Sequence, residues 1–304
     1  MDLRNFSKAG GAFQYTPPRC YELAGQKFVL QMDDGYDILL NFLSRDTLEW
    51  NYVNKEPSAP QTDKYECLKG DDLIYLVSWN LAGVDFKKRQ NFTFVIDLEQ
   101  YLVTHLIASV GRNPRWPYLV DTDFVFGAIQ QEGVEYKHYP RHGFSNDMVG
   151  NVVQWQYSPD MATVHCYYAP NWYRITYPKS AQASQEAAAT TDNFNSLVSA
   201  LPSSDDPSHL VKIKDGVYLV SCTEQNMEKI LGAKAMFRSD TLCFLDNYNH
   251  VYDVGRGFGT MTMTNPETQE ETDSDVFVMI GAYGKIQDPE LYKDVLEAKN
   301  PYLV

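Results

Sequence analysis

The octapeptide LIYLVSWN at residues 73–80 is almost repeated at residues 216–223, which read GVYLVSCT. Apolar residues recur with a period of two around both copies, a pattern that is typical of half-buried β-strands. A second correspondence links Ala24-Gly25 to Val149-Gly150, 125 positions later (150 − 25). The repetition predicts one β-rich unit that the chain uses twice.

Hairpin signals support this interpretation. Phe28, Leu30 and Met32 recur at every second position up to the turn at residues 33–35 (DDG), and a second alternating run follows at residues 36–42. Many short antiparallel strands favour a closed barrel. We therefore predict an all-β protein with two antiparallel β-barrels in tandem.

The predicted domain boundaries follow from these patterns. We assign residues 1–22 to an N-terminal arm, 23–111 to the first barrel, 112–147 to an inter-barrel connection, 148–287 to the second barrel and 288–304 to a short C-terminal helix and tail. The second barrel carries an inserted loop at residues 179–208, rich in Ser, Ala and Asp. This loop is either flexible or a lid over a pocket.

Length and charge limit the classes of protein. A chain of 304 residues with 44% hydrophobic content can bury a large core and form two domains. Its formal net charge of −14 repels phosphate backbones and anionic lipids, so neither nucleic acid nor a membrane is an expected partner. No stretch resembles a signal peptide or a membrane span, and we expect a cytoplasmic location.

We expect neither a metal nor another cofactor. The five cysteines are scattered without a C-x-x-C pair, which predicts reduced thiols. The histidines outside the candidate site have no ligand-like spacing; they are His105, His138, His209 and His250. The glycines within residues 255–259 follow a strand and suit a turn better than a phosphate cradle.

The two copies differ in the residues that face the barrel interior. Alternate residues of a barrel strand point inward. In the first copy these positions are almost entirely apolar, whereas in the second they combine phenols, an indole, an imidazole, a thiol and a carboxylate. The candidate residues are Trp155, Tyr157, His165, Tyr167, Tyr177, Cys222 and Glu224. Such an interior can bind an oriented, partly polar small molecule, and burial raises the pKa of a glutamate.

Each candidate also has a structural alternative. Tyr and Trp are common on either face of a strand, His165 could be a core histidine, and Glu224 could be an exposed carboxylate at the rim. Arg141 and His142 precede the second barrel. They either reach its mouth and supply a cation for a carboxylate or enolate, or lie in a solvated loop.

Several segments resemble the molybdenum-cofactor-biosynthesis protein F family in order and spacing. They include LAGQKFVLQMDDGYDILLNF from residue 23, PRHGFSNDMVGNVVQW from residue 140 and FLDNYNHVYDVGRGFG from residue 244. The resemblance implies two lipocalin-like (calycin) barrels in tandem. Because a fold supports many functions, it does not by itself imply a reaction.

Each barrel also resembles the phenolic acid decarboxylases, which are single-barrel enzymes without a cofactor. These enzymes hold the substrate carboxylate with two tyrosines and use an arginine and a glutamate deeper in the barrel. The resemblance places Trp155 and Tyr157 at the tyrosine pair and Glu224 at the glutamate. No arginine matches, and Leu30 and Met32 replace the tyrosines in the first copy. It thus implies acid–base chemistry on a related conjugated or phenolic ligand in the second barrel.

These observations lead to two hypotheses of different classes. The first is a cofactor-independent lyase, isomerase or cyclase. Its catalytic residues would be Glu224, Tyr157 and His165, and its substrate-binding residues Trp155, Tyr167, Tyr177, Cys222, Arg141 and His142. The alternative is a non-catalytic small-molecule carrier or accessory protein of molybdenum cofactor (pterin) biosynthesis. The carrier could hold its ligand in either barrel. A third interpretation makes the first barrel a scaffold or the surface of a homodimer.

Overall fold

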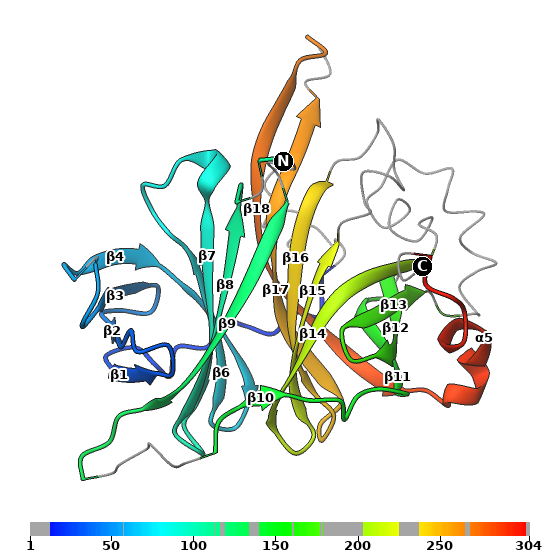
Figure 1. Cartoon of the computed structure of the whole chain (residues 1–304), viewed down its shortest axis with the longest axis horizontal. Helices are drawn as coiled ribbons and strands as arrows, with labels where there is room; N and C mark the ends of the chain where they lie inside the picture. Colours follow the sequence, from blue (N-terminus) through cyan, green and yellow to red (C-terminus); the bar gives the residue numbers. More distant parts are fainter. Residues whose placement is uncertain are drawn as a thin grey trace. The chain divides into compact units, whose positions relative to one another are not determined.

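The chain forms two β-barrels, which divide it into two compact units (Figure 1). The computed structural model describes residues 13–56, 58–112, 114–115, 119–133, 140–159, 161–176, 178, 203–224, 237–264 and 268–301. Described residues within 17–143 and 212–215 belong to the first barrel, and those within 1–16, 144–211 and 216–304 to the second. The predicted fold, nearly all strand with a short C-terminal helix, is confirmed.

The first barrel is a nine-stranded antiparallel sheet with the order β4-β3-β2-β1-β9-β8-β7-β6-β5. Its strands are β1 (Lys27–Met32), β2 (Ile38–Phe42), β3 (Thr47–Tyr52), β4 (Gln61–Lys64), β5 (Glu66–Asp71), β6 (Ile74–Asn80), β7 (Gln90–Asp97), β8 (Leu102–Val110) and β9 (Val120–Ile129), with a 3₁₀ turn η1 (Phe86–Lys88) before β7. Strand β9 lies in the stretch that the sequence assigned to the connection. Asp121 and Asp123 interrupt its apolar pattern, yet β9 pairs with both β1 and β8.

The second barrel is also nine-stranded, with the order β10-β14-β13-β12-β11-β18-β17-β16-β15 and a further pairing of β14 with β15. Its strands are β10 (Gly143–Phe144), β11 (Val152–Ser158), β12 (Met161–Ala169), β13 (Trp172–Thr176), β14 (Ser204–Lys214), β15 (Val217–Glu224), β16 (Phe237–Asn247), β17 (Tyr252–Thr264) and β18 (Glu271–Ile286). Strand β14 begins inside the predicted loop, and residues 179–202 of that loop lie outside the described residues.

The strand registers preserve the duplication. Leu30 pairs with Ile38 across β1 and β2, and Trp155 pairs with Thr163 across β11 and β12, so both partners are displaced by 125 positions. The offset read from the sequence is therefore also the offset between equivalent wall positions of the two barrels.

A second pair of equivalent hairpins is marked by its turns. The turn from β7 to β8 and the turn from β16 to β17 each place a non-glycine residue in the left-handed region, Tyr101 with φ 57° and Val251 with φ 52°. The side-chain oxygens of Asp97 and Asn247 accept backbone N–H bonds in the same positions of the two turns. Residues of these hairpins can therefore be compared at an offset of 150 (251 − 101).

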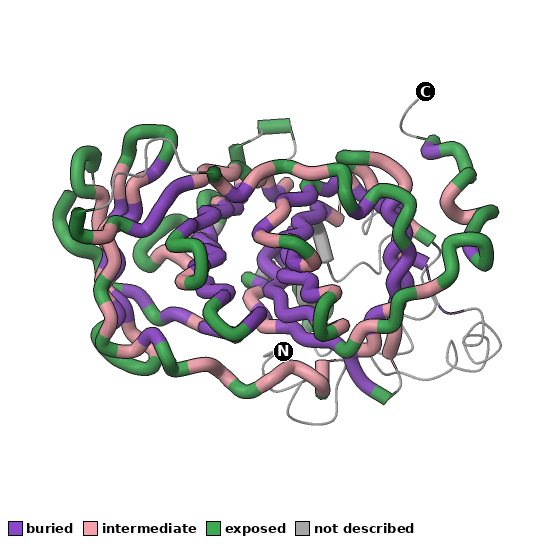
Figure 2. Tube along the Cα trace, turned by 90° about the horizontal axis from the view of Figure 1, so that it is seen from below, coloured by how far each residue is buried: buried purple, intermediate pink, exposed green. Residues whose placement is uncertain are grey.

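The core of each barrel lies between its strands, and buried residues follow the strands in Figure 2. In the first barrel the core is an aromatic stack in which the rings of Trp79 and Phe94 lie parallel, with centroids 5.3 Å apart. In the second, Tyr167 and Tyr173 are stacked at 5.9 Å, and both are fully buried.

The C-terminal segment is fastened to the outside of the second barrel. It consists of a 3₁₀ turn η3 (Pro289–Tyr292) and the short helix α5 (Lys293–Leu296). The guanidinium of Arg174 forms a bidentate pair with Asp205, with both bonds at 2.8 Å, and donates to the carbonyl of Val295 at 2.6 Å. No helix of the described residues is long and apolar enough to span a membrane.

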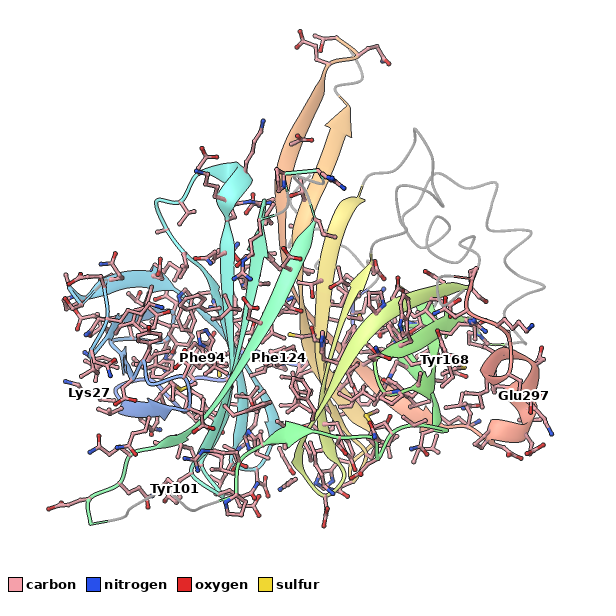
Figure 3. All side chains as sticks on the ribbon, in the orientation of Figure 1. Lys27, Phe94, Tyr101, Phe124, Tyr168 and Glu297 are labelled. Carbon is pink, nitrogen blue, oxygen red and sulfur yellow. The ribbon has the colours of Figure 1, made fainter. Side chains whose placement is uncertain are left out.

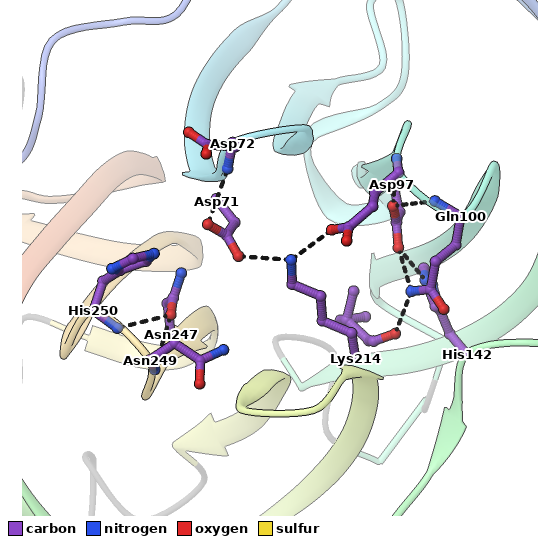
Figure 4. Close-up of polar contacts among 11 residues, drawn as sticks. Asp71, Asp72, Asp97, Gln100, His142, Lys214, Asn247, Asn249 and His250 are labelled. Carbon is purple, nitrogen blue, oxygen red and sulfur yellow. Dashed lines mark hydrogen bonds and ion pairs between the residues drawn. The ribbon is translucent and has the colours of Figure 1, made fainter.

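The end of β14 belongs to the first barrel unit (Figure 4). Lys214 Nζ lies 2.9 Å from Asp71 Oδ2 and 2.6 Å from Glu99 Oε2. Gln100 Nε2 donates to the carbonyl of Ile213 at 3.1 Å. The first unit therefore includes a segment that follows Gly143 by about seventy residues along the chain.

Candidate functional site

The inward face of the second barrel carries a continuous set of polar side chains, which we call the polar strip. It comprises Tyr157 on β11, His165 and Tyr167 on β12, Tyr173 on β13, Asp206 on β14, Cys222 and Glu224 on β15, Asp246 on β16 and Asp253 on β17. All are buried except Glu224, which is half-buried at the end of its strand. Alternation along seven strands brings these side chains to one face.

Two opposed carboxyl groups form one end of the polar strip. Asp246 and Asp253 are direct partners across β16 and β17, and both have an exposed fraction of 0%. Burial raises the pKa of Asp246 to about 8. Burial and the neighbouring Asp246 charge raise the pKa of Asp253 well above its usual range. Because burial disfavours the charged form, Asp246 retains its proton at neutral pH, and the pKa of Asp253 is shifted in the same direction.

The first barrel has no counterpart of this carboxyl pair. Its equivalent hairpin positions, at the offset of 150, are Ile96 and Val103, which are also direct strand partners and fully buried. An aliphatic pair fills the same place without the desolvation that buried carboxyl groups suffer. The carboxyl pair is thus specific to the second copy.

A chain of hydrogen bonds leads from the carboxyl pair into the barrel. The hydroxyl of Tyr167 donates to Asp246 Oδ2 at 3.2 Å and lies 3.5 Å from His165 Nδ1. Nε2 of His165 lies 3.1 Å from the hydroxyl of Thr163. Burial lowers the pKa of His165 to about 3. The imidazole is therefore neutral at physiological pH and can accept or relay a proton.

A thiol and a second carboxyl pair form the other end of the polar strip. The hydroxyl of Tyr173 donates to Cys222 Sγ at 3.2 Å. Burial, followed by the charge of Glu224, raises the pKa of Asp206 well above its usual range. The imidazole of His165 lies between the two ends, with its ring centroid 5.2 Å from that of Tyr173.

Trp155 lies against a glycine of the barrel wall. Its ring contacts Gly284, where an added Cβ would overlap Cζ3 of the indole. The indole also packs edge-on against Tyr248 at 6.2 Å. Nε1 of Trp155 has no hydrogen-bond partner among the described residues. A donor is thus left over in the interior, as expected for a group that orients a ligand.

The sequence-derived candidates fall into three groups. Trp155, Tyr157, His165, Tyr167, Cys222 and Glu224 line the second barrel interior together. Tyr177 lies outside the described residues. Arg141 and His142 belong to the first barrel unit, where Arg141 pairs with Asp33 at 3.1 Å and His142 Nδ1 lies 2.8 Å from the hydroxyl of Thr104. They are not part of the polar strip.

Sequence reasoning did not identify Asp206, Asp246 or Asp253. Asp246 and Asp253 flank the turn after β16, where acidic residues ordinarily reach solvent. The signal that could have found them is the alternation with Phe244, continued by two positions to Asp246 near the end of β16. Among the described residues no group of three or more His, Cys, Asp or Glu side chains could hold a metal ion.

Comparison with known proteins supports the first resemblance. Residues 6–112 match the family model described as "MoaF N-terminal domain", so the sequence-based resemblance to that family is confirmed for this part of the chain. No curated protein sequence matches the chain. A solved structure from Burkholderia vietnamiensis, provisionally described as a beta-lactamase, is similar to 38% of this chain and 98% of its own, with 14% identity and a TM-score of 0.29.

Proposed function

We propose that the second barrel catalyses a cofactor-independent proton transfer on a small, partly apolar molecule, as a lyase, isomerase or cyclase. The observation that carries this proposal is the carboxyl pair of Asp246 and Asp253. Both groups are fully buried, and Asp246 has a pKa of about 8. A general acid or base is most effective when its pKa lies near the working pH.

The chemistry follows from the protonation states. Protonated Asp246 gives its proton to one atom of a conjugated substrate. The carboxylate that remains is stabilised by the Tyr167 hydroxyl at 3.2 Å, and it can take back a proton released from a second atom. Burial and the Asp246 charge raise the pKa of Asp253 well above its usual range, which favours its protonated form. The substrate is thereby isomerised, cyclised or cleaved without a change in the protonation state of the enzyme.

The residues expected to be catalytic take narrower roles in this scheme. Burial raises the pKa of Tyr157 well above its usual range, so its phenol is a neutral donor beside the carboxyl pair. The neutral imidazole of His165 lies within reach of the Tyr167 hydroxyl and positions that side chain. Glu224, half-buried at the end of β15, lies with Asp206 at the opposite end and suits substrate orientation at a strand end better than transfer in the interior.

The test begins with native mass spectrometry of freshly purified protein to identify a bound small molecule. Turnover of that molecule is then measured for Asp246→Asn and Tyr167→Phe. We expect Asp246→Asn to lower kcat by about 10²–10⁴-fold, the usual contribution of a general acid. Tyr168→Phe is the matched control, because Tyr168, labelled in Figure 3, is the next residue of β12. Its hydroxyl donates to Asp205 and not to the carboxyl pair.

Two results would contradict the proposal. If Asp246→Asn turned the molecule over as fast as the unaltered protein, the acid would lie elsewhere. If the molecule were retained and released without chemical change by every variant, the barrel would be a carrier. That second outcome is the one expected for an accessory protein of cofactor biosynthesis.

A further inference from the structure

The first barrel, which the proposed function does not use, contains a cavity of about 650 Å³. That volume lies within the range of pockets for drug-sized ligands, roughly 300–1,000 Å³. The aromatic rings of Trp50, Tyr52 and Phe92 line it, together with aliphatic side chains such as Ile107 and Val125. Trp50 and Phe92 have exposed fractions of only 3% each, so the rings are firmly packed.

A buried carboxylate also lines this cavity. Asp63 has an exposed fraction of 6%. It accepts a hydrogen bond from Trp50 Nε1 at 2.8 Å and another from the backbone N–H of Ala82 at 3.0 Å. A carboxylate offers about four acceptor positions. Two are used here, so Asp63 is fixed in place and retains capacity for another donor.

The charges around the cavity favour a cation. Four of its lining residues are acidic (Asp34, Glu56, Asp63 and Asp123) and two are basic (Lys55 and Arg112), a balance of −2. Arg112 and Asp123 form an ion pair with each other, so they compensate one another at the rim. Lys55 is then the remaining cation against three carboxylates.

The ammonium group of Lys55 already lies over two aromatic rings at this end of the first barrel. Lys55 Nζ lies 4.0 Å from the ring centroid of Tyr36 and 5.1 Å from that of Tyr52. A cation over an aromatic face is attracted by the negative charge of the π-system. Of these two rings, Tyr52 lines the cavity, so the cavity wall offers positive charge both an aromatic face and carboxylates.

Two buried ring nitrogens, those of His105 and Trp79, lie behind the Phe92 ring that lines the cavity. Phe92 packs edge-on against His105 at 4.6 Å and against Trp79 at 5.7 Å, beside the Phe94 ring labelled in Figure 3. Nε2 of His105 and Nε1 of Trp79 have no hydrogen-bond partner among the described residues. Burial lowers the pKa of His105 to about 3, so its imidazole adds no competing positive charge at neutral pH.

From these contacts we infer that the cavity of the first barrel is a binding site for an aromatic organic cation. The aromatic ring of the ligand packs against Trp50 and Phe92, and its ammonium group is received by Asp63 and by the Tyr52 face. This site is separate from the proposed active site, and it gives the first barrel a binding function in place of a purely structural one.

Isothermal titration calorimetry with two matched probes tests this inference on the full-length chain. Tryptamine and indole-3-acetate share an indole ring and carry opposite charges at pH 7. We expect tryptamine to bind at one site per chain and at least about tenfold more tightly than indole-3-acetate, which corresponds to about 1.4 kcal/mol. Equal or tighter binding of the anion, or no binding of tryptamine, overturns the inference.

Variants with opposite expected effects place the binding in this cavity. Asp63→Asn should weaken tryptamine binding at least about tenfold, and Lys55→Gln should tighten it, because the variant removes a like charge from the rim. Asp72→Asn, at an exposed carboxylate outside the cavity, should leave it unchanged. If Asp63→Asn does not fold, Ala82→Trp fills the mouth from an exposed position and should abolish binding; unchanged binding in that variant overturns the inference.

The same titration separates this site from the proposed active site. Asp246→Asn should retain full tryptamine affinity, since its carboxyl group lies in the second barrel. A loss of tryptamine binding in Asp246→Asn, with normal binding in Ala82→Trp, would move the cation site to the second barrel and overturn the inference while leaving the proposed function untouched.

Discussion

Replacing Asp246 with asparagine is expected to stabilise the folded protein, and by more at pH 7 than at pH 5. Folding raises the pKa of this carboxyl group from 3.8 to about 8, so between these values the folded state holds a proton that the unfolded chain releases. Each pKa unit corresponds to about 1.4 kcal/mol. The group therefore opposes folding by about 2 kcal/mol at pH 5 and about 4 kcal/mol at pH 7.

Asparagine mimics the protonated carboxyl group and keeps an acceptor for the Tyr167 hydroxyl, but it does not titrate. Guanidinium chloride denaturation of both proteins at pH 5 and pH 7 measures the difference in unfolding free energy. Comparing the two proteins at each pH cancels the titration of the histidines. Asp72→Asn serves as the surface control. A stabilisation that is equal at both pH values, or a destabilisation that grows with pH, would refute the buried, protonated state of Asp246.

Three further predictions concern stability and reactivity. His105 is buried and has a pKa of about 3, so the folded state loses stability relative to the unfolded chain as the pH falls below 6.5. His105→Phe, which cannot titrate, should therefore be more stable than the unaltered protein by about 3 kcal/mol at pH 4.5 but not at pH 8. Urea denaturation at both pH values measures the difference. Gly284→Ala should destabilise by about 1–3 kcal/mol, because its methyl group overlaps the Trp155 ring; an unchanged thermal midpoint would contradict that packing. A hydrogen bond from the Cys67 thiol lowers the pKa of Cys20 to about 6, so alkylation of Cys20 by iodoacetamide should rise with a midpoint near pH 6 and, in Cys67→Ala, near pH 8 to 9.

The sequence predicted the fold well because its evidence is local and repeated. The octapeptide ending at Asn80 and its copy ending at Thr223 became β6 and β15, and the offset of 125 became a shared strand register. Strand β9 was placed in the connection, because acidic residues at its start hide an alternation that only pairing with β1 and β8 reveals. Such pairing depends on contacts distant in sequence.

The positions of some candidate side chains were predictable from alternation. Trp155, Tyr157 and His165 were named from it, and their side chains lie in the second barrel interior, whereas a role for them in binding or catalysis stays a prediction. Asp246 and Asp253 were not named, because a carboxyl group beside a turn is normally exposed, and only the closed barrel buries these two. Arg141 and His142 were given two interpretations, a reach to the mouth of the second barrel or a solvated loop, because they precede that barrel in sequence. Their hydrogen bonds are made within the first barrel unit.

The exchange of short segments between the two units has a consequence for synthesis on the ribosome. Residues 212–215 complete the first unit, and residues within 1–16 belong to the second, where the backbone N–H of Tyr15 donates to the carbonyl of Tyr157. Domains usually fold in the order in which they are synthesised. Here Lys214 can reach Asp71 and Glu99 only after β11 to β13 have been synthesised, and Tyr15 can reach Tyr157 only after β11 has been synthesised. A cut after Gly143 would therefore separate Lys214 from Asp71 and Glu99, and Tyr15 from Tyr157, so neither piece would hold its whole unit.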